Sequence, residues 1–305
     1  MDTVFIVNPK AGQGKNLDNL IKQIKQSGAQ HYITKSVGDA EKIVREFCQN
    51  RGPARFIACG GDGTFNEVLN GTAEFPVAEI GVLPIGTGND FCRNFDADFL
   101  CVGDLICGKT QKVDAIRYTT NGVTRLCANM FNIGFDCNVA DMSAYMKKKP
   151  LISGSLAYFL SILAMLIKKK GTDIEISIDG KILYNGRLLL TSLANGKYCG
   201  GGIMSNPLSQ VSNGYINVNV IYNVSRLRFI TLLPHYMKGT HMGLKNIEKV
   251  IHNLNCKTVK ITPNTKDFRI CVDGEIQDAG VIEFEIVPDA FNFVVPKTNE
   301  ENMNE

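Results

Sequence analysis

The chain has 305 residues and a mass of 33.5 kDa, which is long enough for two domains of ordinary size. Hydrophobic residues make up 44% of it and charged residues 21%, a balance that excludes collagen-like, disordered and multi-span membrane proteins. A formal net charge of +3 is too small to indicate a nucleic-acid-binding protein. The 10 cysteines form no CxxC pair and no cysteine–histidine group with zinc spacing, and the N-terminus lacks a signal-like apolar run. We therefore expect reduced thiols in a cytoplasmic protein.

The first third of the chain alternates between strand and helix patterns. Apolar runs typical of buried strands occur at residues 3–8, 31–34, 55–59 and 79–84. Apolar residues recur at helical spacing in residues 17–24 and 40–47, and Gly52-Pro53 ends the second of these runs. This alternation predicts an α/β domain whose parallel sheet is covered by helices on both faces. Ligands of such sheets bind beyond the carboxyl ends of the strands.

The pattern changes after about residue 114. Asn121-Gly122, Asp179-Gly180 and Asp273-Gly274 are dipeptides that favour two-residue hairpin turns. Residues 173–178 and 214–222 alternate apolar and polar side chains, as half-buried antiparallel strands do. One helical pattern, over residues 225–238, interrupts the strands. The sequence therefore predicts a β-rich second domain.

One apolar run, residues 151–167, lies between lysine triplets at residues 147–149 and 168–170. It is shorter than the roughly 20 residues that a membrane-spanning helix needs, and it contains Gly154 and several hydroxyl side chains. We expect a buried or half-buried helix. The lysines leave a peripheral membrane contact open as the alternative.

A glycine-rich turn follows the third expected strand, where residues 60–64 read GGDGT. Its glycines let backbone N–H groups approach an anion, and the helix that begins there adds a favourable dipole. Asp62 would repel a phosphate directly, so it suits this site only when Mg²⁺ or its water molecules lie in between. Thr64 and Glu67 have the spacing of a capping box, and Gly71 suits the C-terminus of the helix. The alternative is an ordinary strand–helix turn with an incidental aspartate.

A second glycine-rich turn follows the fourth expected strand, where residues 84–91 read PIGTGNDF. It supplies another backbone cradle, the hydroxyl of Thr87 and the carboxylate of Asp90. Two such turns on successive strands of one sheet predict a nucleotide site between them. Residues 8–15, NPKAGQGK, are not a P-loop because Asn16 stands where Ser or Thr is required. We expect them to form a strand–helix loop at the same edge of the sheet.

These motifs, together with a late VDGE at residues 272–275, resemble the catalytic region of diacylglycerol kinases. The resemblance is greatest to the soluble bacterial lipid kinases of that family, and it covers about residues 3–296. A GGDGT turn also occurs in NAD kinases and, as a near variant, in phosphofructokinases. GTGNDF in the second turn narrows the resemblance to lipid and sphingosine-type kinases.

The resemblance implies an α/β nucleotide-binding domain with a parallel sheet and a second, all-β sandwich-like domain that receives the lipid, with ATP bound in a cleft. The first domain would comprise residues 1–116 and the returning segment 288–298, and the second residues 117–287. Residues 299–305 are polar and are expected to form a disordered tail.

The resemblance also assigns residues to ATP, to Mg²⁺ and to the chemistry. The nucleotide contacts that it implies are Asn8, Pro9, Lys10, Ala11, Gly12, Thr34, Gly60, Gly61, Asp62, Gly63, Thr64, Phe65, Asn66, Thr87 and Glu275. The carboxylates that match the network around the catalytic Mg²⁺ are Asp62, Asp90 and Asp114. Asp273 matches the general base. From the residues alone Asp273 is a turn residue like Asp179, because Asp-Gly is the commonest hairpin dipeptide.

The sequence departs from the family at a second, structural Mg²⁺ site, where the family commonly has Asp-Gly-x-Leu-Asp. Residues 213–217 here read NGYIN, so both acidic positions are neutral amides. The ligands would be Asn213 and the carbonyls of Gln210 and Tyr215. Hard cations prefer carboxylate to amide oxygen, so we expect at most a weakly held ion.

We predict an ATP- and Mg²⁺-dependent lipid kinase at a membrane surface, with diacylglycerol as the favoured substrate and phosphatidic acid as the product. The alternatives are a kinase of phosphatidylglycerol, a sphingoid base or a polyprenol, a kinase of a soluble substrate such as NAD, and a non-catalytic nucleotide-binding regulator. We expect a cytoplasmic protein with peripheral membrane contact and no nucleic-acid partner, and a homodimer stays open. The four histidines show no ligand spacing and are expected at the surface or in packing; they are His31, His235, His241 and His252.

Overall fold

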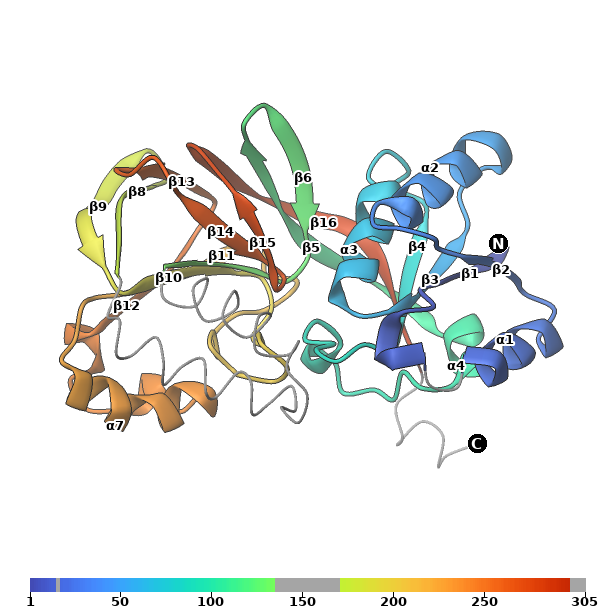
Figure 1. The fold of residues 1–305 in the computed structure, drawn as a ribbon, viewed down its shortest axis with the longest axis horizontal. Helices are drawn as coiled ribbons and strands as arrows, with labels where there is room; N and C mark the ends of the chain where they lie inside the picture. The colour runs from blue at the N-terminus through green and yellow to red at the C-terminus, as the bar shows by residue number, and fades with distance from the viewer. Residues whose placement is uncertain (15–16, 135–170, 297–305) are drawn as a thin grey trace. The chain divides into compact units, whose positions relative to one another are not determined.

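The computed structural model describes residues 1–14, 17–134 and 171–296 (Figure 1). The chain divides into two compact units, one of Met1–Ala115 with Pro288–Glu305 and the other of Ile116–Val287. Within the described ranges, no helix is both long enough and apolar enough to cross a membrane. The helix expected at residues 151–167, its lysine triplets and the tail at 299–305 lie outside the described residues.

The first unit is built on a parallel sheet, as the alternating pattern predicts. Its strands have the order β2-β1-β3-β4, and neighbours run parallel throughout. They are β1 (Thr3–Val7), β2 (Gln30–Ile33), β3 (Arg55–Gly60) and β4 (Glu79–Pro84). The C-terminal half of β16 (Ile282–Val295) pairs in parallel with β4 through Asn292 and Phe293. Strands β1 and β3 are buried at every position after the first, as in sheets covered on both faces.

The helices of the first unit follow its strands. They are α1 (Leu17–Gln26), α2 (Asp39–Arg51), α3 (Asp62–Gly71) and α4 (Val102–Cys107), with short 3-10 turns η1 (Ala11–Gly14) and η2 (Cys92–Asn94). Gly71 lets α2 approach α3, because a Cβ on it would lie 2.8 Å from the Cβ of Val44. Gly71 is the last residue of α3, and Thr72 follows it as the C-cap residue.

The capping box predicted for α3 is wrong. No side chain caps this helix at its start. The Glu67 carboxylate instead accepts the backbone N–H groups of Gly38 and Ala40, at 2.9 and 3.1 Å. Glu67 therefore caps the neighbouring helix α2, and the local spacing that suggested a box is incidental.

The second unit is an antiparallel sandwich. Its first sheet has the order β16-β13-β8-β9 and also includes the β5–β6 hairpin, and its second has the order β12-β11-β10-β7-β14-β15. The strands of the first sheet are β5 (Lys109–Thr120), β6 (Val123–Cys127), β8 (Thr172–Ile178), β9 (Lys181–Leu188), β13 (Thr258–Pro263) and the first half of β16. Those of the second are β7 (Met130–Gly134), β10 (Leu190–Ala194), β11 (Ile216–Ile221), β12 (Ile251–Cys256), β14 (Arg269–Val272) and β15 (Glu275–Asp278).

The two sheets of the sandwich enclose an apolar core. The ring of Phe131 lies 4.9 Å from the ring of Tyr118 and 4.9 Å from that of Phe284, both edge-on. The three predicted hairpins are confirmed, because both residues of each turn have positive φ, as a type I′ turn requires. They are Asn121-Gly122, Asp179-Gly180 and Asp273-Gly274.

Strand β11 differs from its prediction. Alternation predicted one exposed face, yet all six of its residues are buried. The polar residues Asn217 and Asn219 are buried because other amides bond to them: Asn253 donates to both side chains, at 3.0 and 2.7 Å. The helix of this unit is α7 (Arg226–Met237), and the 3-10 turns η3 (His241–Gly243) and η4 (Ile247–Lys249) follow it.

Candidate active site

Three loops that are far apart in sequence meet at the carboxyl edge of the parallel sheet. They follow β1, β3 and β4, which are neighbours in the sheet. The side-chain amide of Asn8 donates to the hydroxyl of Thr64 at 3.0 Å and joins the first loop to the second. The backbone N–H of Gly86 donates to the carbonyl of Gly60 at 3.1 Å and joins the second loop to the third.

Only glycine fits at the positions where these loops touch. A Cβ on Gly86 would lie 2.4 Å from the Cα of Gly61, and one on Gly12 would lie 2.4 Å from the carbonyl oxygen of Ile85. Gly61 also precedes the first turn of α3, which begins at Asp62. The loops therefore place glycine backbone beside the N-terminus of a helix, an arrangement that binds phosphate.

Two carboxylates converge within this group of loops. Oδ1 of Asp62 accepts the backbone N–H groups of Asp90 and Phe91, at 2.8 and 3.4 Å. A Cβ on Gly88 would lie 2.6 Å from Oδ2 of Asp62 and 3.6 Å from Oδ2 of Asp90. Burial raises the pKa of Asp62, and the backbone N–H groups that it accepts oppose that rise. Mg²⁺ is commonly held by one or two carboxylates together with water and substrate phosphates, so this pair fits Mg²⁺.

Aromatic packing fixes the two carboxylate loops. Phe65, one turn along α3 from Asp62, stacks on Phe91 with ring centroids 4.7 Å apart. Phe91 in turn meets the edge of Phe293 on β16 at 5.1 Å. Phe65, a predicted nucleotide contact, is therefore buried, and its backbone N–H donates to the carbonyl of Gly61 at 3.1 Å.

Asn89 is a site residue that the sequence reasoning missed. It adopts φ 55°, in the left-handed region, and its amide donates to the carbonyls of Pro84 and Gly86 at 3.0 and 2.9 Å. These bonds fix the shape of the second glycine-rich turn. Asparagine tolerates left-handed backbone, so its place between Gly88 and Asp90 was a signal that could have found it.

The other predicted residues of the first unit lie in these loops, on α3 or in the sheet. Pro9, Lys10 and Ala11 lie in the loop after β1, Gly63 and Asn66 in the first two turns of α3, and Thr87 is exposed in the second turn. Thr34 is buried, and its backbone N–H donates to the carbonyl of Val7 at 2.9 Å. Asp114 is buried on β5 and accepts the N–H of Asp289 at 2.9 Å. In the described ranges no three acidic, histidine or cysteine side chains form a metal-binding group, and the place of Asp114 in the Mg²⁺ network stays a prediction.

Asp273 lies in the second unit, in the turn between β14 and β15. It is half-buried, and its two oxygens accept the N–H of Met130 at 3.0 Å and the thiol of Cys127 at 3.2 Å. Burial and the charge of Asp273 raise the pKa of Cys127, so this thiol remains a protonated donor. The carboxylate is thereby held in one orientation. Glu275, the predicted nucleotide contact, is exposed at the start of β15.

The corresponding aspartate of another hairpin has a different environment. Asp179 has the same φ of 46°. Its Oδ1 accepts the backbone N–H groups of Lys257 and Thr258, at 3.0 and 2.9 Å. Asp179 therefore holds the connection between β12 and β13, and it provides a matched control for Asp273.

Comparisons with known proteins agree with this architecture. Residues 2–118 match the family model described as the diacylglycerol kinase catalytic domain. Residues 129–295 match the model described as the YegS C-terminal NAD kinase beta sandwich-like domain. A diacylglycerol kinase from Staphylococcus aureus is 30% identical over 89% of this chain and 85% of that protein. The chain belongs to the diacylglycerol kinase family. It is a lipid kinase.

Other relatives extend the match to the whole chain. The diacylglycerol kinase of Bacillus subtilis is 28% identical over 99% of this kinase and 98% of that protein. A crystal structure of a diacylglycerol kinase from Bacillus anthracis shares the fold with a TM-score of 0.71 at 22% identity, over 96% of both chains. A yeast NADH kinase, solved with NADH, shares it more distantly, with a TM-score of 0.54 at 13% identity over 100% of this chain and 87% of that one.

The loop of this kinase that corresponds to the family's structural Mg²⁺ site contains a side-chain cation. The Lys257 ammonium donates to the carbonyl of Gly214 at 2.5 Å and lies 3.9 Å from the centre of the Tyr215 ring. Asn213, a proposed ligand, accepts the backbone N–H of Tyr215 at 3.0 Å. Gln210 precedes this turn and is exposed.

The second amide position of this loop is also engaged. Asn217 accepts from Asn206 at 3.1 Å and donates to Asn255 at 2.8 Å. A carboxylate cannot donate, so this network requires an amide. The loop therefore does not fit a Mg²⁺ ion, because the side-chain oxygens of Asn213 and Asn217 already accept hydrogen bonds within the protein and Lys257 supplies the positive charge.

Substitution of Asn217 tests this interpretation. Asn217→Asp should lower the free energy of unfolding by about 1–3 kcal/mol, because Asn255 loses its donor and a charge is buried. Asn213→Asp is the control and should be tolerated, since its side chain only accepts. Urea unfolding with and without millimolar Mg²⁺ measures both effects. Restoration of the Asn217→Asp variant by Mg²⁺, beyond any shift in the wild type, would show that the loop does bind the metal.

Proposed function

We propose that this lipid kinase transfers the γ-phosphate of ATP to the free hydroxyl of diacylglycerol in a Mg²⁺-dependent reaction, giving phosphatidic acid and ADP. The observation that carries the proposal is the pair of joined glycine-rich loops in which Asp62 and Asp90 converge on Gly88. Diacylglycerol is the proposed acceptor because relatives named diacylglycerol kinase match nearly the whole chain.

The first unit supplies the phosphate-binding part of this proposal. Backbone N–H groups of the loops at residues 60–64 and 84–90 would bind the phosphates, together with the N-terminus of α3. Asp62 and Asp90 would hold Mg²⁺ and its waters, and the bound ion would neutralise charge on the phosphates. The carboxylate of Asp62, buried and with a raised pKa, favours a cation beside it.

Asp273 is proposed as the general base. The lipid hydroxyl oxygen forms a bond to the γ-phosphorus, the bond from that phosphorus to the β,γ-bridging oxygen breaks, and ADP leaves. The proton of the hydroxyl passes to the Asp273 carboxylate. Its bonds to Met130 and Cys127 would keep one face of the carboxylate oriented while the group remains half-exposed.

A panel of acceptors separates this proposal from its alternatives. The kcat/KM of the purified kinase should be highest for diacylglycerol and lower for phosphatidylglycerol, a sphingoid base, a polyprenol and NAD. A higher value for another lipid would correct the substrate and keep the lipid kinase. Phosphorylation of NAD alone, or ATP binding with no transfer to any acceptor, would replace the proposal with one of the other two alternatives.

We also propose that the kinase reaches diacylglycerol by peripheral contact with the cytoplasmic face of a membrane. The lysines at residues 147–149 and 168–170 would favour anionic lipid, each by roughly 1 kcal/mol close to the surface, over a Debye length of about 8 Å. Binding to anionic vesicles should exceed binding to neutral ones and weaken with salt. Vesicle flotation of a variant with Lys147, Lys148 and Lys149 replaced by Gln measures the contribution of these lysines to membrane binding. Binding equal to that of the wild type at low salt would show that they do not contact the membrane.

A further inference from the structure

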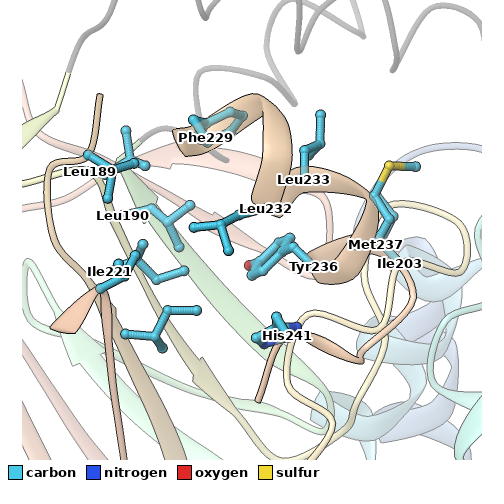
Figure 2. A pocket seen from close by; sticks show the side chains of 13 residues that line it. Leu189, Leu190, Ile203, Ile221, Phe229, Leu232, Leu233, Tyr236, Met237 and His241 are labelled. Atoms are coloured by element: carbon cyan, nitrogen blue, oxygen red, sulfur yellow. The ribbon is translucent and has the colours of Figure 1, made fainter. Parts of the chain in front are cut away.

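Helix α7 has apolar side chains on two sides, and its inner side packs on the sandwich (Figure 2). The inner residues follow the 3–4 spacing of a core-facing stripe and are half-buried; they are Phe229, Leu232, Leu233 and Tyr236. Figure 2 shows Leu232 and Tyr236 pointing toward the strands. The apolar pocket left beneath them measures only about 40 Å³, and His241 is buried there with its ring centroid 5.0 Å from that of Tyr236. The inner side is therefore already covered.

The outer side of α7 is apolar at its centre and faces solvent. Leu227 is 79% exposed and Ile230 is 53% exposed, and residues three positions apart are neighbours on a helix surface. Three further exposed residues follow Leu227 at 3–4 spacing, on the side opposite the inner stripe; they are Thr231, Pro234 and the C-cap residue Lys238. Leu227 and Ile230 therefore form a patch, rather than two scattered surface residues.

Positive charge surrounds this patch. Residues 225–249, which include α7 and the turns after it, contain five basic residues and one acidic residue, whereas the whole chain has 33 and 30. The sequence of α7 itself contains no acidic residue. Arg228 and Lys238 are exposed, and no acidic side chain in the described part of the chain forms an ion pair with either. The outer side of α7 thus combines aliphatic side chains with positive charge that the protein does not neutralise.

This combination selects the kind of surface that α7 can meet. Aliphatic side chains beside lysine and arginine are typical of helices that lie in the interface of an anionic membrane. A neutral membrane would leave the positive charge without a partner. A second copy of the chain is disfavoured, because a two-fold contact would bring the same positive charges together. The 12 residues of α7 extend over about 18 Å, which suits a helix that lies parallel to a bilayer surface.

We propose that the outer side of α7 docks on an anionic membrane surface. Leu227 and Ile230 enter the boundary between headgroups and acyl chains, and Arg228 and Lys238 meet the anionic headgroups. The inference rests on the proposed peripheral contact of the kinase and adds to it a docking surface on α7.

A single fluorophore tests whether this side of α7 enters the membrane, because the sequence contains no tryptophan. Leu227→Trp reports on α7, and Val123→Trp, at an exposed position on β6, is the control. Vesicles of phosphatidylglycerol and phosphatidylcholine, without ATP, should shift the emission of the first variant to the blue and leave the second unchanged. Brominated acyl chains should quench only the first, and salt should reverse both effects. An unchanged emission of Leu227→Trp, or an equal response to purely neutral vesicles, would overturn the proposal.

Replacement of the apolar pair measures its contribution to docking. Leu227→Gln with Ile230→Gln should weaken binding to the anionic vesicles by about tenfold or more, because two aliphatic side chains no longer leave water. Val123→Gln with Ile182→Gln changes two exposed aliphatic residues on β6 and β9 and should bind as the wild type does. Equal affinities of the two double variants would overturn the proposal. A change of oligomeric state in sedimentation, with vesicle binding unchanged, would assign the patch to a second copy instead.

Turnover separates this inference from the proposed function. The Leu227→Gln, Ile230→Gln variant should phosphorylate a short-chain diacylglycerol in detergent micelles at the rate of the wild type, since no bilayer is involved. Vesicle binding is measured without ATP. Vesicle binding through α7 without turnover in micelles would therefore refute only the proposed function, and turnover in micelles without an effect of α7 on vesicle binding would refute only this inference.

Discussion

Replacing Asp273 with asparagine should reduce turnover by about 10²–10⁴-fold and leave ATP affinity near that of the wild type. Asn-Gly favours the same turn as Asp-Gly, so the hairpin of β14 and β15 is retained. The amide oxygen can still accept the N–H of Met130, but the amide cannot take a proton from the lipid hydroxyl. Steady-state kinetics gives the turnover, and calorimetric titration gives the ATP affinity.

Asp179→Asn is the matched control for this substitution. It changes the same dipeptide in a turn of the same φ, where the carboxylate holds Lys257 and Thr258. We expect unchanged turnover per folded molecule and a modest loss of stability. Full activity in a folded Asp273→Asn protein, or an equal loss in both variants, would return Asp273 to the role of a turn residue.

Asp62→Asn should have opposite effects on activity and on stability. Activity should fall by at least about 10²-fold, because a charge that neutralises the cation beside the phosphates is lost. The melting temperature of the ligand-free protein at pH 7 should rise. The asparagine oxygen can still accept the N–H of Asp90, while the buried charge disappears. A buried charge that lowers stability is typical of functional sites.

The pH dependence of this stability effect follows from the raised pKa of Asp62. As pH rises above about 3.8, the unfolded chain releases this proton before the folded protein does, so the folded state loses stability. The loss is complete above the folded pKa and absent at lower pH. The advantage of Asp62→Asn should therefore shrink as the pH is lowered toward 4, in thermal scans across pH. Asp96→Asn, exposed in a nearby loop, is the control and should show neither effect. A melting temperature at or below that of the wild type at pH 7 would contradict the account.

The elements that could be predicted from the sequence are those that local residues determine. The alternation of apolar runs gives β1 to β4, and the Asp-Gly and Asn-Gly turns give the hairpins, because each depends on neighbours in the chain. Glu67 shows the limit of this reasoning. Its spacing from Thr64 matches a capping box, yet its carboxylate bonds to Gly38 and Ala40, about thirty positions away. Burial of β11 likewise depends on Asn253, which no local pattern reveals.

The same limit applies to the candidate site. Asp62 and Asp90 follow adjacent strands, so the order of the sheet brings them together. The Cys127 thiol that bonds to Asp273 is 146 positions away and has no motif. His241 had no ligand spacing, and only the surrounding strands and α7 make it the polar group of an apolar pocket. These contacts depend on long-range packing, which cannot be inferred from a single sequence.

The central claim is tested most directly by incubating the purified kinase with γ-labelled ATP, Mg²⁺ and a total lipid extract, and then identifying every labelled product by mass spectrometry. The account predicts phosphatidic acid as the main labelled lipid, its loss without Mg²⁺ and its near absence with Asp273→Asn. A different labelled lipid would contradict the assignment of diacylglycerol. Label found only in inorganic phosphate would contradict the transfer of phosphate to a lipid.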